Sequence, residues 1–155
     1  MSLAYIAQAA EHQELEWIGG STMTILLDGA ATGGQVTVVR SRLQEGAASP
    51  VHLHRREDEM FVVLAGHGLF WVGDECHEVG EGGAVFLPRD VPHAYRFTSP
   101  EVDLLTICTP SGMEDFFRAA GRDVREPRPE GWDVSMGALV AAAVAGGQEI
   151  LGPPR

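Results

Sequence analysis

The chain of 155 residues contains no lysine and no asparagine, and it has only two cysteines. The absence of lysine excludes catalysis through a lysine Schiff base. Cys76 and Cys108 are too few and too far apart to indicate a disulfide framework or a zinc site built from thiolates. We therefore expect two ordinary reduced thiols, and any catalytic chemistry has to come from other side chains.

Long hydrophobic runs and positive charge are also scarce. The longest run of small apolar residues, 137–147, is about half of the ~20 residues that a membrane-spanning helix needs. The N-terminus lacks the positive region and the continuous apolar stretch of a secretory signal. The net charge of -11 disfavours binding to nucleic acids and to anionic membranes. We therefore predict a soluble, cytoplasmic protein with no nucleic-acid or membrane partner.

Short segments rich in β-branched and aromatic residues follow one another between residues 21 and 109. Glycine-containing turns separate these segments, as at 33–34 and 80–83. Many short strands at near-regular spacing are typical of an all-β sandwich or barrel, and a chain of this length is expected to form one core. The pattern predicts strands at 22–27, 35–42, 60–64, 69–72, 84–87, 94–97 and 102–109.

The pattern changes after Pro110. Ser111 and Glu114 have the spacing of a capping box, and Gly121 stands where a short helix would end. A second helix is predicted at about 134–145, where apolar residues recur at helical spacing. The sequence thus predicts three regions: an N-terminal extension at 1–20, a β-barrel at 21–110, and a C-terminal helical extension at 111–155 packed on the barrel.

Two histidines stand at alternating positions in the segment PVHLHRREDEMF. Side chains at i and i+2 of a strand point to the same face, so His52 and His54 project together. Glu59 follows at the start of the next apolar run, and His93 enters a later strand. Three imidazoles and one carboxylate on one face are a ligand set for a divalent first-row metal, which would offset the cost of burying them. We predict that these four residues bind one such ion, with Fe, Mn, Ni, Co and Zn left open.

A charged turn at residues 55–58 separates His54 from Glu59. Its two arginines and two acids are interpreted as a solvated loop, while the ligands point inward. Three further histidines, His12, His67 and His77, lie in helical, turn and hairpin segments without other potential metal ligands. They are interpreted as structural side chains.

These residues resemble the two sequence motifs of the cupin superfamily. The first motif is matched at every defined position by Gly46-x5-His52-x-His54-x4-Glu59-x6-Gly66. The segment Gly82-x5-Pro88-x-Asp90-x2-His93 resembles the second motif. It departs from the family pattern at Asp90, which replaces a turn glycine, and at Phe97, where the family often has asparagine. Neither position is a metal ligand.

Longer runs extend the resemblance from about residue 20 to the C-terminus. They include HRREDEMFVVLAG, FLPRDVPHAYRF, TPSGMEDFFRAAG and EILGPP, which are similar to small single-domain cupins of the bacterial quercetin 2,3-dioxygenase type. The resemblance implies an all-β cupin fold, a jelly-roll-like barrel of two antiparallel sheets with the metal inside and with the short predicted helices at the C-terminus. It also implies a homodimer.

The resemblance further implies a chemistry for the site. A substrate hydroxyl or enol would bind near or on the metal, which would lower the pKa of that group. Glu59 would then be the catalytic residue, taking the proton as a general base in addition to serving as a ligand. Whether Glu59 contacts the metal directly or acts from a position beside it is left open.

Counting by two along the strands gives candidate pocket residues. Tyr95 and Phe97 share a face with His93, and Phe61 shares a face with Glu59. We predict that Phe61, Tyr95 and Phe97 bind a flat aromatic substrate, with ordinary core packing as the alternative.

Three functions follow from this interpretation. The first is a metal-dependent dioxygenase, an oxidoreductase acting on a small flavonol-like or other enolic aromatic substrate. The second is a cupin-type polyketide cyclase or isomerase, which would use the metal without dioxygen. The third is a non-catalytic cupin that binds a small molecule, because a fold and a ligand set do not fix a function.

Overall fold

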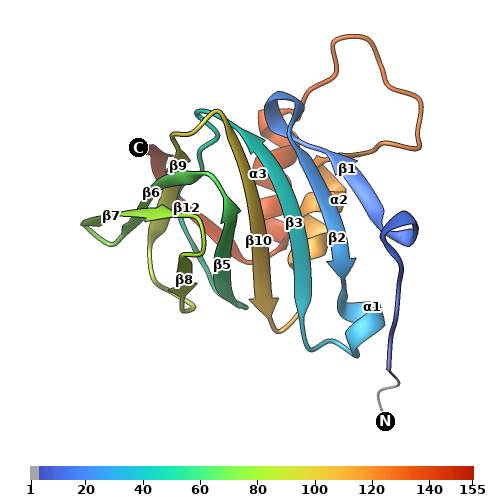
Figure 1. The fold of residues 1–155 in the computed structure, drawn as a ribbon, viewed down its shortest axis with the longest axis horizontal. Helices are drawn as coiled ribbons and strands as arrows, with labels where there is room; N and C mark the ends of the chain where they lie inside the picture. Colours follow the sequence, from blue (N-terminus) through green and yellow to red (C-terminus); the bar gives the residue numbers. More distant parts are fainter. Residues whose placement is uncertain (1–3) are drawn as a thin grey trace.

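The strands form two antiparallel sheets that lie face to face (Figure 1). The structure is a computed structural model that describes residues 4–155, so the first three residues of the predicted N-terminal extension lie outside the described residues. One sheet has seven strands in the order β11-β1-β2-β3-β10-β5-β8, and the other has five in the order β12-β4-β9-β6-β7. The predicted all-β class is confirmed.

The larger sheet consists of β1 (Gln13–Glu16), β2 (Thr22–Leu27), β3 (Thr37–Gln44), β5 (Asp58–Ala65), β8 (Ala84–Leu87), β10 (Glu101–Thr109) and β11 (Arg122–Asp123). The smaller sheet consists of β4 (Pro50–His54), β6 (His67–Val72), β7 (Glu75–Gly80), β9 (His93–Phe97) and β12 (Gln148–Pro154). The helical segments are η1 (Ala9–Glu11), η2 (Ile18–Gly20), α1 (Gly29–Thr32), α2 (Met113–Ala120) and α3 (Met136–Ala145).

The seven predicted strands all form, with ends displaced by at most two residues. The pattern of apolar runs did not predict β1, β4, β7, β11 or β12, although the alternation of His52 and His54 indicated a strand at β4. Strand β7 is polar and mostly exposed, so it lacks the alternation of apolar residues that marks a half-buried strand. Strand β12 contains glycine and two prolines, which are tolerated because it pairs only with β4 at the sheet edge, with two register shifts.

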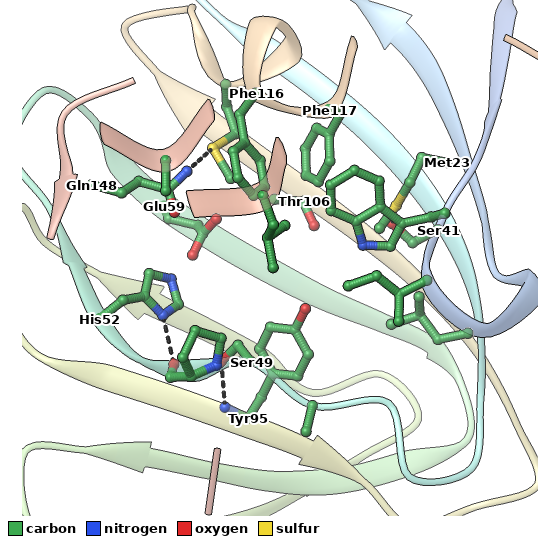
Figure 2. A pocket seen from close by; sticks show the side chains of 18 of the residues that line it. Met23, Ser41, Ser49, His52, Glu59, Tyr95, Thr106, Phe116, Phe117 and Gln148 are labelled. Carbon is green, nitrogen blue, oxygen red and sulfur yellow. Dashed lines mark hydrogen bonds between the residues drawn. The ribbon is translucent and has the colours of Figure 1, made fainter. Parts of the chain in front are cut away.

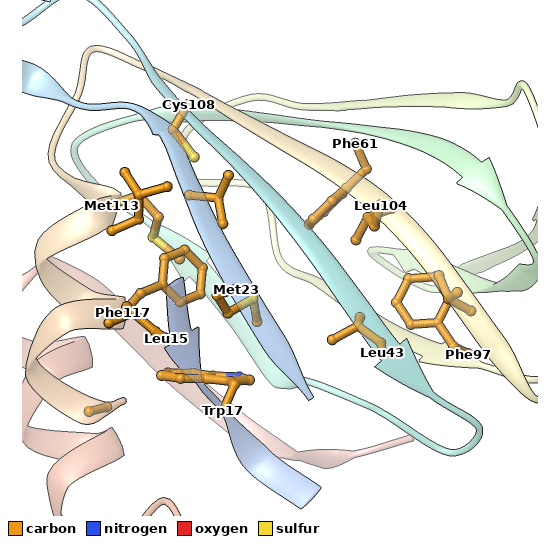
Figure 3. Packing of buried hydrophobic residues seen from close by; sticks show 14 of the residues in the cluster. Leu15, Trp17, Met23, Leu43, Phe61, Phe97, Leu104, Cys108, Met113 and Phe117 are labelled. Carbon is orange, nitrogen blue, oxygen red and sulfur yellow. The ribbon is translucent and has the colours of Figure 1, made fainter. Parts of the chain in front are cut away.

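The core lies between the two sheets. Alternate residues of β3, β5 and β10 are buried, as expected for strands with one face against a second sheet. Figure 3 shows Leu43, Phe61 and Leu104 on neighbouring strands, with Phe97 from the other sheet packed beside them. Within residues 4–155, no helix is both long enough and apolar enough to cross a membrane.

Gly66 lies where the chain passes from one sheet to the other. It connects β5 of the larger sheet to β6 of the smaller sheet. Its φ is +88°, and an added Cβ would come within 2.5 Å of the carbonyl oxygen of Glu101. Only glycine fits this position without strain, which gives a physical reason for the last residue of the first motif.

The two longer helices lie beside the larger sheet (Figure 1). Helix α3 begins after Ser135, whose hydroxyl accepts a hydrogen bond from the backbone N–H of Ala138, close to the predicted start. Helix α2 begins after Gly112, so the capping box predicted at Ser111 is not formed. The carboxylate of Glu114 instead accepts hydrogen bonds from the N–H of Gly29 and the hydroxyl of Thr37, which tie α2 to α1 and β3.

Candidate metal centre

Three strands bring together the four side chains that the sequence singles out. His52 and His54 come from β4, Glu59 from β5 and His93 from β9. All four are buried, with 2–7% of each residue exposed. Their nitrogen and oxygen atoms lie within 4.8 Å of one another. Two atoms that share one metal at about 2.1 Å lie up to about 4.2 Å apart, so small side-chain shifts would suffice for a common ion.

Strand pairing accounts for this convergence. His52 and His54 share a face of β4, and His52 lies directly opposite His93 on β9. The turn that leads into β9 contains Asp90 with a φ of +66°, a conformation that aspartate adopts more readily than most residues. The N–H of Asp90 donates to the carbonyl oxygen of His54 at 2.9 Å. The departure from the motif's turn glycine is therefore accommodated, and the turn is fastened to the ligand strand.

Hydrogen bonds fix which nitrogen of each imidazole carries the proton. Nδ1 of His52 lies 2.8 Å from the carbonyl oxygen of Pro50, and Nδ1 of His93 lies 3.0 Å from that of Val91. A carbonyl oxygen can only accept, so Nδ1 is the donor in both rings. In the neutral form, both residues then direct an unprotonated Nε2 at the centre of the cluster, as a metal ligand requires.

The third imidazole has a different partner. Nδ1 of His54 donates to Oε1 of Glu57 at 2.7 Å, and Glu57 is buried. The prediction that this acid belongs to a solvated turn was therefore wrong. The C-terminal segment covers the turn, because the N–H of Arg55 donates to the carbonyl oxygen of Gly147 and the guanidinium of Arg56 donates to that of Ala145.

The donor atoms in the middle of the cluster fit a cation. Nε2 of His52 lies 3.2 Å from Nε2 of His54, so in the neutral rings two lone pairs face each other. Nε2 of His93 lies 3.2 Å from a carboxylate oxygen of Glu59, yet among the described residues it has no partner with hydrogen-bond geometry. Such an arrangement is costly unless something binds these atoms, and a divalent cation accepts all of them.

Charge in the cluster also favours a cation. Burial, together with the neighbouring His93, lowers the pKa of His52 to about 4, so its ring is neutral at pH 7. Burial alone would lower the pKa of His54, but the carboxylates of Glu59 and Glu57 raise it. Burial alone would raise the pKa of Glu59, but His54 and His93 lower it to about 2, so Glu59 is ionised.

The cluster opens into a cavity with about 760 Å³ of empty space, open solvent at its mouth included. Figure 2 shows His52 and Glu59 at one side of this cavity and Met23 with Phe117 at the other, and Trp17 also lines it. The wall between them is mainly apolar, and it also carries a few polar groups: Ser41, Ser49, Tyr95, Thr106 and Gln148. A polar end with two candidate ligands and a long aromatic wall is the form of a small-molecule site.

Two of the three predicted pocket residues line the cavity, and the third does not. Phe61 and Tyr95 line the cavity, and Figure 2 shows the Tyr95 hydroxyl directed into it. Phe97 does not line it and lies in the core, with its ring 5.8 Å from that of Phe70. The space for this ring is above Gly68, where an added Cβ would come within 2.7 Å of Phe97. The glycine opposite Phe97 therefore explains why the aromatic side chain packs inward.

Much of the cavity wall comes from segments that strand counting could not place. Trp17 precedes β2, and Phe116 and Phe117 belong to α2. The rings of Phe116 and Phe117 lie 5.5 and 5.2 Å from that of Trp17 in edge-on contact. The adjacent phenylalanines of the predicted helix were the only sequence signal of this aromatic wall.

Comparison with known proteins agrees with the motifs and the fold. Residues 39–110 match the family model described as a cupin domain. The chain contains a cupin domain. The matched segment contains all four residues of the candidate metal centre, whereas Trp17 and the two phenylalanines of α2 lie outside it.

Three relatives illustrate the range of proteins that this cupin resembles. It is 26% identical to the quercetin 2,3-dioxygenase of Bacillus subtilis (strain 168) over 77% of this chain and only 35% of that enzyme. The structure of KdgF from Halomonas sp. aligns with a TM-score of 0.64 at 18% identity, over 72% of this chain and 98% of that one. Pac13 from Streptomyces, a nucleoside dehydratase, aligns with a TM-score of 0.57 at 18% identity, over 72% and 87%.

Proposed function

We propose that this cupin is a metal-dependent dioxygenase of the quercetin 2,3-dioxygenase type, acting on a flavonol-like or other enolic aromatic substrate. The observation that carries the proposal is the opening of the buried histidine and glutamate cluster into a cavity with aromatic walls. Similarity to the Bacillus dioxygenase supports the reaction class. The chain spans about a third of that enzyme. The activity of this chain is therefore proposed from its own candidate metal centre and cavity.

His52, His54 and His93 would hold the metal through Nε2, and Glu59 through its carboxylate. Neutral imidazoles and a carboxylate suit Fe, Mn, Co, Ni or Zn as the divalent ion. When bound, the ion would polarise a substrate hydroxyl and lower its pKa, which favours the enolate that reacts with dioxygen. The three Nδ1 hydrogen bonds would keep the imidazoles oriented while the substrate binds.

Glu59 is the proposed proton acceptor. It lines the cavity and is ionised at neutral pH, since its pKa is lowered to about 2. A carboxylate with so low a pKa accepts a proton readily only from a strongly acidified hydroxyl. Proton transfer to Glu59 would therefore depend on the lowered substrate pKa, and the same carboxylate can serve as a ligand before the substrate binds.

The cavity wall would bind and orient the ring system. Phe61 and Tyr95 lie near the cluster, with ring centroids 5.7 Å apart, and Trp17 with Phe117 bounds the other side. Edge and face contacts with aromatic rings of this kind favour a flat ligand and exclude water from it. Burial and the nearby Glu59 raise the pKa of Tyr95, so its hydroxyl stays protonated as a hydrogen-bond donor.

A cyclase or isomerase that needs no dioxygen is the second candidate. The Tyr95 hydroxyl, which can donate a hydrogen bond to a substrate oxygen, and the Glu59 carboxylate, which can accept a proton, lie on the wall of one cavity. Such a pair suits the movement of a proton from one substrate atom to another without any change of oxidation state. A binding protein without catalysis is the third candidate, and turnover of any substrate would exclude it.

Oxygen uptake distinguishes the first two candidates. We expect dioxygen consumption when quercetin or a related flavonol is added to protein reconstituted with Fe, Mn, Co or Ni. The measurement is an oxygen-electrode screen, with metal-free protein and free metal ion as controls. Metal-loaded protein that consumes no dioxygen with any flavonol or enolic aromatic would contradict the dioxygenase and favour the second candidate. Homodimeric assembly and a cytoplasmic location stay predictions, because a single chain tests neither.

A further inference from the structure

Glu57 distinguishes His54 from the other two imidazoles. His52 and His93 donate to backbone carbonyl oxygens, whereas His54 donates to a carboxylate. The Nδ1–Oε1 distance of 2.7 Å is at the short end of the range for a charge-assisted hydrogen bond. Glu57 has 4% of its surface exposed, so this bond lies almost entirely out of water.

Among the described residues, no arginine forms an ion pair with Glu57. The three arginines nearest in sequence or across the adjoining turn are exposed and bonded to other groups. Arg55 pairs with Asp90 and Glu149, Arg56 donates to the carbonyl oxygen of Ala145, and Arg89 pairs with Asp58. No arginine is buried in the part of the chain that the structure describes. A buried carboxylate is costly without a compensating charge.

A cation bound in the candidate metal centre would supply the positive charge that compensates Glu57. Glu59 and Glu57 are the two carboxylates in contact with His54, one on each side of the ring. Together they carry two negative charges beside three imidazoles that can be neutral. A divalent cation bound at Nε2 of His54 would balance both charges, one through direct contact and one through the imidazole ring.

We propose that Glu57 is a positioning residue of the metal centre. Its carboxylate holds His54 in the tautomer that offers Nε2 to the metal, fixes the plane of the ring, and supplies the second negative charge that matches a dication. This inference rests on the proposed metal-dependent function. It assigns to an acid inside the charged turn a role that lies beyond the four candidate ligands.

Two substitutions separate the hydrogen bond from the charge. Glu57→Gln keeps an oxygen that can accept from Nδ1 of His54 but removes the charge. Glu57→Leu removes both with little change in volume. Loss of a partner behind a metal-bound histidine typically weakens metal binding by about 10- to 100-fold. We expect about 10-fold weaker binding for Glu57→Gln and about 100-fold weaker binding for Glu57→Leu, with the ranking as the main result.

The experiment is a chelator competition with Zn(II) and Co(II) on the full-length chain, together with the visible absorption spectrum of the Co(II) form. A shifted Co(II) spectrum in Glu57→Leu, restored toward wild type in Glu57→Gln, would show a changed ligand geometry. Glu114→Gln is the matched control. Glu114 is also a buried acid, but it accepts from Gly29, Gly112 and Thr37 and does not touch the cluster. It should lose thermal stability while keeping the wild-type affinity and spectrum.

The outcomes distinguish this inference from the function on which it rests. Wild-type protein that binds metal, with both Glu57 variants equal to it in affinity and spectrum, would overturn the role of Glu57 and leave the metal centre intact. Wild-type protein that binds neither ion would overturn both. Circular dichroism checks that each variant is folded, and the milder Glu57→Gln keeps the test decisive if Glu57→Leu fails to fold.

Discussion

Replacing His54 with alanine is expected to abolish tight metal binding. The substitution removes one of the candidate ligands and also the donor to Glu57, which is then left buried without a partner. The loss should exceed the roughly 10- to 100-fold that removal of an outer partner costs, because the ligand itself is gone. The measurement is elemental analysis of reconstituted protein after free metal has been removed, with wild-type protein expected to retain one ion per chain.

His67→Ala is the matched control for this substitution. His67 is exposed, bonds through Nδ1 to the hydroxyl of Thr98, and lies outside the cluster. Its variant should retain the metal at the wild-type level. Full metal occupancy in His54→Ala would contradict the assignment of His54 as a ligand, and equal losses in both variants would indicate general destabilisation.

Replacing Glu59 with glutamine is expected to largely preserve metal binding and to collapse turnover. The glutamine oxygen can still approach the metal, but the amide cannot accept the substrate proton. General-base catalysis contributes about 10²- to 10⁴-fold to a rate, so kcat should fall by a factor in this range. The measurement is oxygen uptake with the substrate identified by the flavonol screen, set beside the metal content of the same samples.

Each possible failure of this prediction has its own meaning. Turnover within about 10-fold of wild type would contradict the role of Glu59 as the base, since the expected loss is larger. Loss of the metal from Glu59→Gln would indicate that the negative charge of Glu59 is needed for metal binding. Glu114→Gln again provides a buried acid outside the cluster, and its kcat should stay at the wild-type level.

The sequence was sufficient to predict most of the sheet architecture. Strands such as β2 and β8 form with the predicted boundaries because short apolar runs between glycine turns have few alternatives to pairing. The candidate ligands were predictable for two reasons. His52 and His54 follow from the two-residue period of a strand. Glu59 and His93 follow from their places at the start of later strands, and the motif pattern supports all four.

The turn at residues 55–58 shows why the rest was not predictable. Its run of charged residues has the composition of a solvated loop, and local physics gives no reason to bury Glu57. The C-terminal segment lies against this turn, where Gly147 accepts a hydrogen bond from the N–H of Arg55, almost a hundred positions earlier in the chain. Contacts between segments so far apart are set by the assembled fold and leave no local signal in the sequence.

The cavity wall shows a second limit. Strand counting correctly put Phe61 and Tyr95 beside the cluster, but it put Phe97 there as well. The alternation along β9 does not show which residue of the paired strand β6 lies opposite each side chain. Gly68 lies opposite Phe97 and leaves room for its ring, which therefore packs in the core and not in the cavity wall. Trp17 and Phe117 reach the cavity from segments beyond the barrel, so the width of the pocket depended on how those segments pack.

The central claim is that His52, His54, Glu59 and His93 hold a single divalent ion inside the barrel. The most direct test is anomalous diffraction at the absorption edge of the metal from crystals of reconstituted protein. We expect one strong anomalous peak, bonded to Nε2 of the three histidines and adjoining the Glu59 carboxylate. An anomalous map with no peak among these side chains, from protein that has been supplied with each candidate metal, would contradict it.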